Sequence, residues 1–156
     1  MSGDLFAEAW LGVDPGQSGA AALIGPGAVV YEILDWPGDP RAAAVRLQEW
    51  ALEYDIQAAA IERVSAMPKQ GVASSFKFGV NFGVWQGLVA AAGISCQMPT
   101  PREWQRGTIK PSDGKDPKSR SLAVARRLFP GAPLARKKDS DRADALLIAR
   151  WIRGQG

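Results

Sequence analysis

Four acidic residues in the sequence have the side-chain type and the placement of a divalent-metal site. Asp14 ends the apolar stretch AWLGVD, and Glu62 ends the apolar stretch QAAAIE. Asp141 and Asp144 are three residues apart, so in a helix they lie on one face. Four carboxylates that meet repel one another unless cations neutralise them, and an all-oxygen donor set suits Mg²⁺ or Mn²⁺. The pattern therefore indicates a site for one of these ions.

Each of these acids also has a structural interpretation. Asp14 could form a turn with the Pro-Gly pair that follows it, Glu62 could pair with a basic neighbour, and Asp141 could interact with the positive end of a helix. Asp144 is harder to explain in this way. It lies a full turn into the predicted helix, on the side that Ala145 and Ile148 make apolar.

The composition excludes several other kinds of site. The chain has no His, which removes Ser-His-Asp triads, His general bases and the usual zinc sites. Cys96 is the single cysteine, so it forms no internal disulfide, and its apolar surroundings favour a place in the core. Catalysis by this chain would therefore depend on carboxylates, lysines or a metal ion.

The charged residues are unevenly distributed. Residues 1–62 contain ten acidic and two basic residues, whereas residues 63–138 contain fourteen basic and three acidic residues. A basic half indicates a polyanionic partner such as nucleic acid, although basic loops can also be only solvated surface. No apolar run reaches the roughly 20 residues of a membrane helix, and the opening MSGDLFAEAW lacks the basic region of a signal peptide. We therefore expect no membrane segment and a cytoplasm-like location.

Apolar periodicity and turn residues predict the elements that must position the acids. Strands are expected at residues 9–14, 18–25, 28–35, 57–62 and 93–98. Helices are expected at residues 40–54 after Asp39, at 72–92, in a short segment from Thr100, at 117–129 after Asp116, and at 139–153.

The order of these elements, βββαβαβ followed by helices, implies an α/β fold. Its centre is a five-stranded mixed sheet with helices on its faces, in a single domain over residues 1–156. Neighbouring strands of such a sheet bring Asp14 and Glu62 to one edge, and the helix 139–153 adds its two acids there.

Four motifs in order carry a resemblance to a known family. They are G-V-D-P-G, A-I-E, P-x-x-W followed by a basic loop, and D-R-A-D-A-L-L-I-A, spread over residues 9–153. Together they resemble the RuvC family of Holliday junction resolvases, which has the ribonuclease H-like fold. The resemblance implies that Asp14, Glu62, Asp141 and Asp144 are catalytic acids that bind two Mg²⁺ or Mn²⁺ ions. It further implies a homodimer that makes paired nicks in four-way junction DNA, with Lys118 at a position where a family lysine supports catalysis.

The chain departs from the bacterial members of this family at one position. Where they place an aromatic residue three positions after the strand-ending Glu, this chain has Ser65. The segment MPKQGVASSFKFGVNFGVWQG is more similar to phage and chloroplast resolvases. These similarities are compatible with a phage protein acting in the host cytoplasm or with an organellar protein.

Several basic and polar residues near the predicted site are candidates for contacts with DNA. Around the start of the helix 72–92 they are Lys69, Gln70, Lys77 and Asn81, and around the basic loop they are Lys110, Lys115 and Arg120. Those near the start of the helix are placed to contact backbone phosphates or the centre of the junction, and Arg136, Lys137 and Lys138 are expected to make non-specific phosphate contacts whose affinity falls with salt.

Glycines recur every four residues in the predicted helix 72–92, at Gly79, Gly83 and Gly87. Each disfavours a helix by roughly 1 kcal/mol relative to Ala, so packing must offset them. The flat stripe could pack against the sheet of the same chain or against its copy at a twofold dimer interface. Phe78, Phe82 and Trp85 on the same helix are expected to be core or interface anchors.

The sequence therefore predicts a metal-dependent, structure-selective DNA endonuclease. An RNA-processing nuclease of the same fold would keep the same acids. A junction-binding module without catalysis is less compatible with four retained acids. An ATP-binding protein of the actin and sugar-kinase class, suggested by D-P-G-Q-S-G, needs two domains, for which 156 residues are too few.

Overall fold

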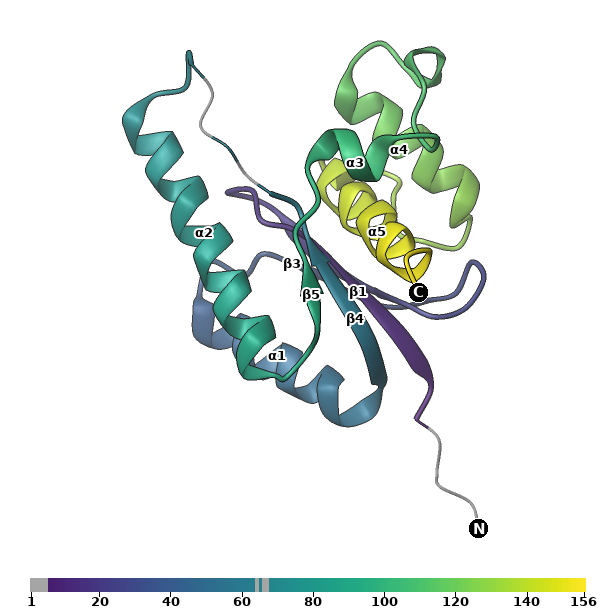
Figure 1. The fold of residues 1–156 in the computed structure, drawn as a ribbon. Helices are drawn as coiled ribbons and strands as arrows, with labels where there is room; N and C mark the ends of the chain where they lie inside the picture. Colours follow the sequence, from purple (N-terminus) through teal and green to yellow (C-terminus); the bar gives the residue numbers. More distant parts are fainter. Residues whose placement is uncertain (1–5, 64, 66–67) are drawn as a thin grey trace.

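The computed structural model describes residues 6–63, 65 and 68–156 (Figure 1). Residues 1–5, which belong to the opening segment considered above, lie outside the described residues. So does Met67, the first residue of the segment that resembles phage and chloroplast resolvases. Within the described part of the chain, no helix has the length and hydropathy needed to span a membrane.

The centre of the fold is a five-stranded mixed sheet. Its strands are β1 (Glu8–Asp14), β2 (Ala20–Ile24), β3 (Val30–Asp35), β4 (Asp55–Ile61) and β5 (Cys96–Gln97). Their order in the sheet is β3-β2-β1-β4-β5. The first three strands form an antiparallel meander, and β4 runs parallel to both β1 and β5. The predicted sheet is therefore confirmed.

Helices cover both faces of this sheet (Figure 1). They are α1 (Pro40–Glu53), α2 (Val72–Ala91), α3 (Pro101–Gln105), α4 (Pro117–Leu128) and α5 (Ser140–Arg153), with 3₁₀ turns at Pro111–Asp113 and Lys137–Asp139. Helices α1 and α2 pack on one face, and α3, α4 and α5 pack on the other. The inner strands are consequently buried on both faces, which explains why β2 is apolar at every position.

Local signals place most helix starts where the sequence predicts them. Asp39 caps α1 through its side chain, and Asp116 caps α4 in the same way. Thr100 and Glu103 form a reciprocal capping box at the start of α3. Each of these residues satisfies backbone N–H groups that the first helical turn leaves without partners.

The bounds of all five strands, including β4 and β5, differ from the predicted ones by one to three residues. Strand β4 begins at Asp55 and ends at Ile61, so Glu62 follows the strand directly. Strand β5 is only two residues long, shorter than the predicted strand over 93–98. The reason is its position at the edge of the sheet, where it pairs only with Ala59 and Ala60 of β4.

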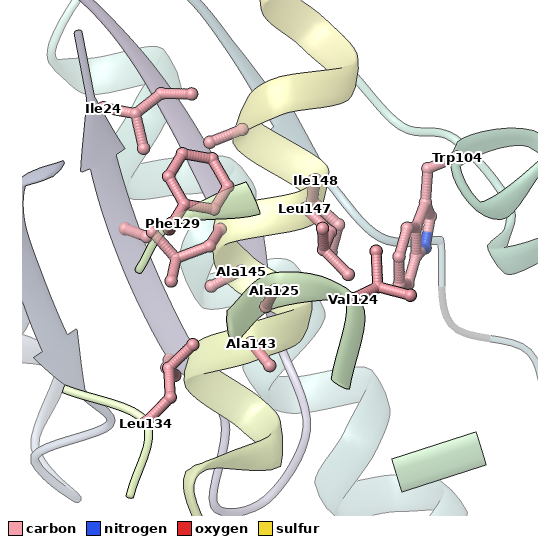
Figure 2. Close-up of a cluster of buried hydrophobic side chains, with 14 of the residues drawn as sticks. Ile24, Trp104, Val124, Ala125, Phe129, Leu134, Ala143, Ala145, Leu147 and Ile148 are labelled. Carbon is pink, nitrogen blue, oxygen red and sulfur yellow. The ribbon is translucent and has the colours of Figure 1, made fainter. Parts of the chain in front are cut away.

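Helix α5 lies directly against β1, and a glycine makes this possible. A Cβ atom added at Gly12 would lie 2.8 Å from the Cα atom of Ala149 and would also overlap the backbone of Ala145. Only a residue without a side chain permits this approach. Figure 2 shows Ala145, Leu147 and Ile148 of α5 within the core on this face of the sheet. The packing fixes the position of α5 relative to the sheet.

Candidate active site

The four acids come from three elements that meet at one end of the sheet. Asp14 is the last residue of β1, and Glu62 directly follows β4. The backbone N–H of Glu62 donates to the carbonyl of Val13 at 3.1 Å, which holds the two strand ends side by side. Asp141 and Asp144 lie in the first turns of α5, which crosses this end of the sheet.

Asp14 is buried, with 8% of its surface exposed. Its Oδ1 accepts a hydrogen bond from the backbone N–H of Gly16 at 3.0 Å, so the turn-forming interpretation of this residue is also correct. Burial raises the pKa of Asp14 well above its usual value, and repulsion from Asp144 and Glu62 raises it further. The single turn hydrogen bond does not compensate for these costs.

Asp144 has the least compensated carboxyl group of the site. Its Oδ1 atom is buried and has no hydrogen-bond partner in the described part of the chain. Burial raises the pKa of Asp144 to about 7, and the charges of Glu62 and Asp141 add to the rise. The hydroxyl of Ser121 and the charge of Lys118 oppose it. The carboxylate form of this residue therefore needs a nearby cation.

A tryptophan holds Glu62. The indole Nε1 of Trp104 donates to Oε2 of Glu62 at 2.6 Å, and Trp104 itself is 1% exposed. Figure 2 shows its ring beside Val124 and Leu147 in the core. Burial raises the pKa of Glu62, and this hydrogen bond opposes the rise. Sequence reasoning did not assign this role, although the P-x-x-W motif that contains Trp104 was its signal.

The acids of α5 and the residue before it have different partners. Oδ2 of Asp141 accepts a hydrogen bond from the hydroxyl of Ser18 at 2.8 Å. Asp139, which precedes the helix, is paired with Arg136 at 2.7 Å. Arg142 pairs with Asp35 at the end of β3 at 2.6 Å. The Arg142–Asp35 pair attaches the start of α5 to the sheet, whereas the Arg136–Asp139 pair stabilises the turn before the helix.

The residues present fit a hard divalent cation. As the side chains stand, no three His, Cys, Asp or Glu residues of the described segments are arranged to hold a metal ion. However, the donors are all carboxylate oxygens, one of them is buried without a partner, and several of the acids repel one another. Mg²⁺ and Mn²⁺ prefer such donors and would remove the repulsion.

Comparisons with known proteins agree with this geometry. No protein-family model matches the chain. The chloroplastic Holliday junction resolvase MOC1 of Chlamydomonas reinhardtii is 38% identical over 97 residues, which are 60% of this chain and 11% of that protein. The chain thus corresponds to a small part of that relative's length.

Two solved structures of Thermus thermophilus RuvC match 96% of this chain and 96% of their own. The first, a complex with a Holliday junction substrate, has a TM-score of 0.63 at 18% identity. The second has a TM-score of 0.60 at 21% identity. The chain is RuvC-like in fold. The predicted ribonuclease H-like class and the resemblance drawn from the four motifs are confirmed.

A pocket of about 200 Å³ opens at the acids of this RuvC-like chain. Asp14 and Glu62 line it together with Arg63, Ser65, Gln70 and Phe78. Phe78 therefore lies at the site, whereas its predicted companions Phe82 and Trp85 pack in the core between α2 and the sheet. The pocket thus has an aromatic side chain from α2, Phe78, although Ser65 stands where bacterial family members place an aromatic residue.

The other candidates for DNA contact near α2 lie beside this pocket. Lys77 and Asn81 line a second hollow, of about 390 Å³, which Gln17 also borders. The side-chain amide of Asn81 donates to the carbonyl of Gly16 at 3.3 Å, which joins α2 to the turn after β1. Lys69 is exposed in the turn that precedes α2.

The residues of the basic loop differ in their surroundings. Lys118 lies close enough to Asp144 to lower the pKa of that carboxyl group. Lys110 and Lys115 are exposed. Arg120 uses its Nε atom to donate to the carbonyl of Gly114 at 2.9 Å, so part of its guanidinium group holds the loop in place.

The glycine stripe of α2 does not pack against its own chain. Within the part of the chain that the structure describes, a Cβ atom added at Gly79, Gly83 or Gly87 would meet no atom within 4 Å outside the backbone of its own helix. Exposed apolar side chains lie on the same helical face, namely Val72 at 88%, Phe76 at 72% and Val80 at 47% exposure. Of the two interpretations of the stripe, packing against its own sheet is therefore wrong for these three glycines.

Proposed function

We propose that this chain is a metal-dependent endonuclease that resolves four-way DNA junctions by paired symmetric nicks, with residues 1–156 acting as one nuclease domain. The observation that carries the proposal is the meeting of four carboxylates from β1, the end of β4 and α5, among which Asp144 has a buried oxygen without a hydrogen-bond partner in the described residues. The relative MOC1 is named as a Holliday junction resolvase, and one RuvC structure contains a junction substrate.

In this proposal Asp14, Glu62, Asp141 and Asp144 hold two Mg²⁺ or Mn²⁺ ions. When bound, such a pair of ions lowers the pKa of an attacking water and neutralises charge on the leaving 3′-oxygen. The neighbouring residues orient the ligands. Trp104 fixes one oxygen of Glu62, and Ser18 fixes one oxygen of Asp141.

Lys118 has a separate role in this proposal. It lies at the start of α4, near the acidic residues, and its positive charge lowers the pKa of Asp144. Its ammonium group supports catalysis by stabilising negative charge that develops on the phosphate during cleavage.

Junction DNA would lie across the end of the sheet where the acids meet. Lys69, Gln70, Lys77 and Asn81 contact it from the side of α2, and Lys110, Lys115 and Arg120 contact it from the side of the basic loop. Gln70 and Asn81 already border the hollows at this end of the molecule. A DNA substrate requires a compartment that contains DNA, either a cytoplasm or an organelle.

Paired nicks need two active sites, and the outer face of α2 provides the surface for a homodimer. This face combines the open glycine stripe with the exposed side chains of Val72, Phe76 and Val80. A helix that is apolar on both its inner and outer faces is typically buried on both. A second copy of α2 across a twofold axis would cover it.

A cleavage assay tests the proposal. We expect a synthetic four-way DNA junction to be cut at symmetric positions in the presence of Mg²⁺, and duplex DNA of the same sequence to stay intact. The Asp144→Asn variant should bind the junction in EDTA as the wild type does and should not cut it in Mg²⁺. This pairing of results separates loss of catalysis from loss of folding.

Two results would overturn the proposal. Cleavage of structured RNA in preference to the junction would identify an RNA-processing nuclease of the same fold. Junction cleavage that is unchanged in Asp144→Asn would remove this residue from the reaction.

A further inference from the structure

A second, larger groove lies beside the acidic pocket. It has a volume of about 610 Å³ and runs along the edge of the sheet at β5, between α3 and α5. Three arginines and one tryptophan line it, namely Arg63, Arg102, Arg106 and Trp151. None of these residues belongs to the candidate DNA contacts described above.

The groove is positively charged. The guanidinium groups of its three arginines make no hydrogen bond or ion pair with any residue that the structure describes. Glu103 is the acid among the lining residues, and its carboxylate accepts the backbone N–H of Thr100 at 2.7 Å as part of the α3 capping box. It is therefore committed to the helix. Along with the hydrogen bonds to Thr100, the charge of Arg63 contributes to the lowered pKa of Glu103, although no salt bridge joins the two side chains. Three arginines that make no hydrogen bond or salt bridge to a described residue and face one space form a surface suited to phosphate groups.

The groove adjoins the acidic pocket. Arg63 directly follows Glu62 in the chain and lines both spaces. Pro101, the first residue of α3, lines the acidic pocket, and its neighbour Arg102 lines the groove. A strand whose phosphate lies at the acids would therefore pass next to the groove.

Trp151 adds a surface of a different chemistry. It is half-buried, and it packs against the core on one side while it lines the groove on the other. An aromatic ring among arginines is typical of surfaces that bind nucleic-acid strands, because the ring contacts sugars or bases and the arginines contact phosphates.

We propose that the groove formed by Arg63, Arg102, Arg106 and Trp151 binds the backbone of the cut DNA strand where it continues beyond the acidic pocket. This inference rests on the proposed function, because that function places the strand at the acids. A free phosphate would contact the arginines alone, whereas a strand held at the acids would also contact the ring of Trp151 in the adjoining groove.

Binding measurements in EDTA test this inference, since no cleavage occurs there. We expect Arg102→Glu/Arg106→Glu to bind a fluorescent four-way junction at least roughly tenfold more weakly than the wild type and to lower the slope of log affinity against log salt by about 2. Trp151→Ala should weaken binding several-fold without changing that slope. Trp151→Phe, which keeps an aromatic face, should restore most of the affinity.

The matched control is Arg41→Glu/Arg46→Glu on α1, which makes the same change of charge on the opposite face of the sheet. Thermal unfolding of each variant shows that it is folded. Equal loss of affinity in the two double variants would contradict the proposal that the groove binds the cut strand. It would leave the proposed junction cleavage by the wild type unaffected. Failure of the wild type to bind the junction at all would instead overturn the proposed function and, with it, the occupant assigned to this groove.

A second measurement locates the contact on the DNA. Neutral methylphosphonates placed one at a time along the cut strand should weaken wild-type binding at positions next to the cut. The same replacements should have little further effect in Arg102→Gln/Arg106→Gln, because the contact is already absent. Inorganic phosphate that competes with the junction equally in both proteins would show an anion site unrelated to the strand and would overturn the inference.

Discussion

At the scale of single residues, the site combines acidic side chains with neighbours that fix their orientation. Burial and mutual repulsion destabilise the charged forms of these acids. Asp14 is buried, Asp144 has a buried Oδ1 atom, and the two carboxylates repel each other, while Glu62 receives a hydrogen bond from Trp104. The folding of the rest of the chain must outweigh this local cost. Such uncompensated acids are typical of sites that act on a ligand.

Trp104 allows a sharp test of ligand orientation. Trp104→Phe keeps an aromatic ring in the core but removes the N–H that holds Glu62. We expect the Mg²⁺ concentration for half-maximal cleavage to rise roughly tenfold, as is usual when a residue that orients a metal ligand is lost. High Mg²⁺ should restore most of the rate.

Trp50→Phe is the matched control for this variant. Trp50 is 2% exposed, lies in the core on the other face of the sheet, and its Nε1 has no hydrogen-bond partner among the described residues. Both substitutions remove similar buried area, so both should lower stability to a similar degree. If the two variants had the same Mg²⁺ dependence, the proposed role of Trp104 would be wrong.

The identity of the acids could be predicted from the sequence, but their surroundings could not. Asp14 and Glu62 end apolar strands, and Asp144 lies on the apolar side of a helix, so their types and positions predict that they meet. The hydrogen bonds of Trp104 and Ser18 join residues far apart in the chain, and the groove is lined by residues from separate segments. Only the packing of α3 and α5 against the sheet brings these residues to the site.

At the scale of elements, α2 differs from the other helices. Its inner face packs in the core through Trp85 and Val89, while its outer face is open at the three glycines. Hydrophobic periodicity predicts the helix correctly but cannot distinguish these two faces, because both are apolar. The structure shows that the glycine stripe lies on the outer face of α2, away from the core of its own chain.

Gly83→Leu tests the outer face of α2. Apart from the backbone of α2 itself, no atom of the described residues lies within 4 Å of an added Cβ, and replacing a helical Gly stabilises a helix by about 1 kcal/mol. We therefore expect the folded monomer to be at least as stable as the wild type. Self-association should weaken by at least roughly tenfold, because the bulky side chain prevents close approach of a second helix. Sedimentation velocity over a range of concentrations measures this change.

Ala51→Leu is a suitable comparison, since Ala51 is exposed on α1 and gains the same side chain away from α2. It should associate as the wild type does. A wild type that remains monomeric at concentrations where it makes paired nicks would contradict the dimer.

At the scale of the whole molecule, the acidic centre links stability to pH and to metal. Asp144 has an ordinary pKa of 3.8 when unfolded and a pKa of about 7 in the folded chain, so between these values the folded state binds more protons. The metal-free protein should therefore lose stability as pH rises from about 5 to about 8, by about 2 kcal/mol. Arg142 lowers the pKa of Asp35, and Arg136 lowers the pKa of Asp139, so both carboxylates stabilise the folded state when they are ionised. This contribution to stability is lost only at lower pH, as the two groups become protonated.

Urea unfolding in EDTA at each pH measures this dependence. Asp144→Asn should be more stable than the wild type at the higher pH and should show a smaller pH slope, because its amide does not ionise. Adding Mg²⁺ should raise the stability of the wild type at the higher pH and have little effect on the variant. A wild type that gains stability as pH rises through this range would contradict the assigned burial of these acids.

The overall architecture could be predicted more completely than the partner surfaces. The order of strands and helices follows from turn residues, caps and periodicity, and the structure reproduces it. The basic character of residues 63–138 predicts a polyanionic partner, but it does not separate the loop lysines from the arginines of the β5 edge. That distinction depends on which guanidinium groups the fold leaves without partners.

The contact of α5 with β1 at Gly12 has a consequence for the synthesis of the protein. Asp14 and Glu62 leave the ribosome long before Asp141 and Asp144, and the sheet lacks the helix that completes its second face until α5 has emerged. A nascent chain therefore carries only half of the acidic centre. In the proposed function, cleavage of DNA would thus first become possible when α5 docks against β1.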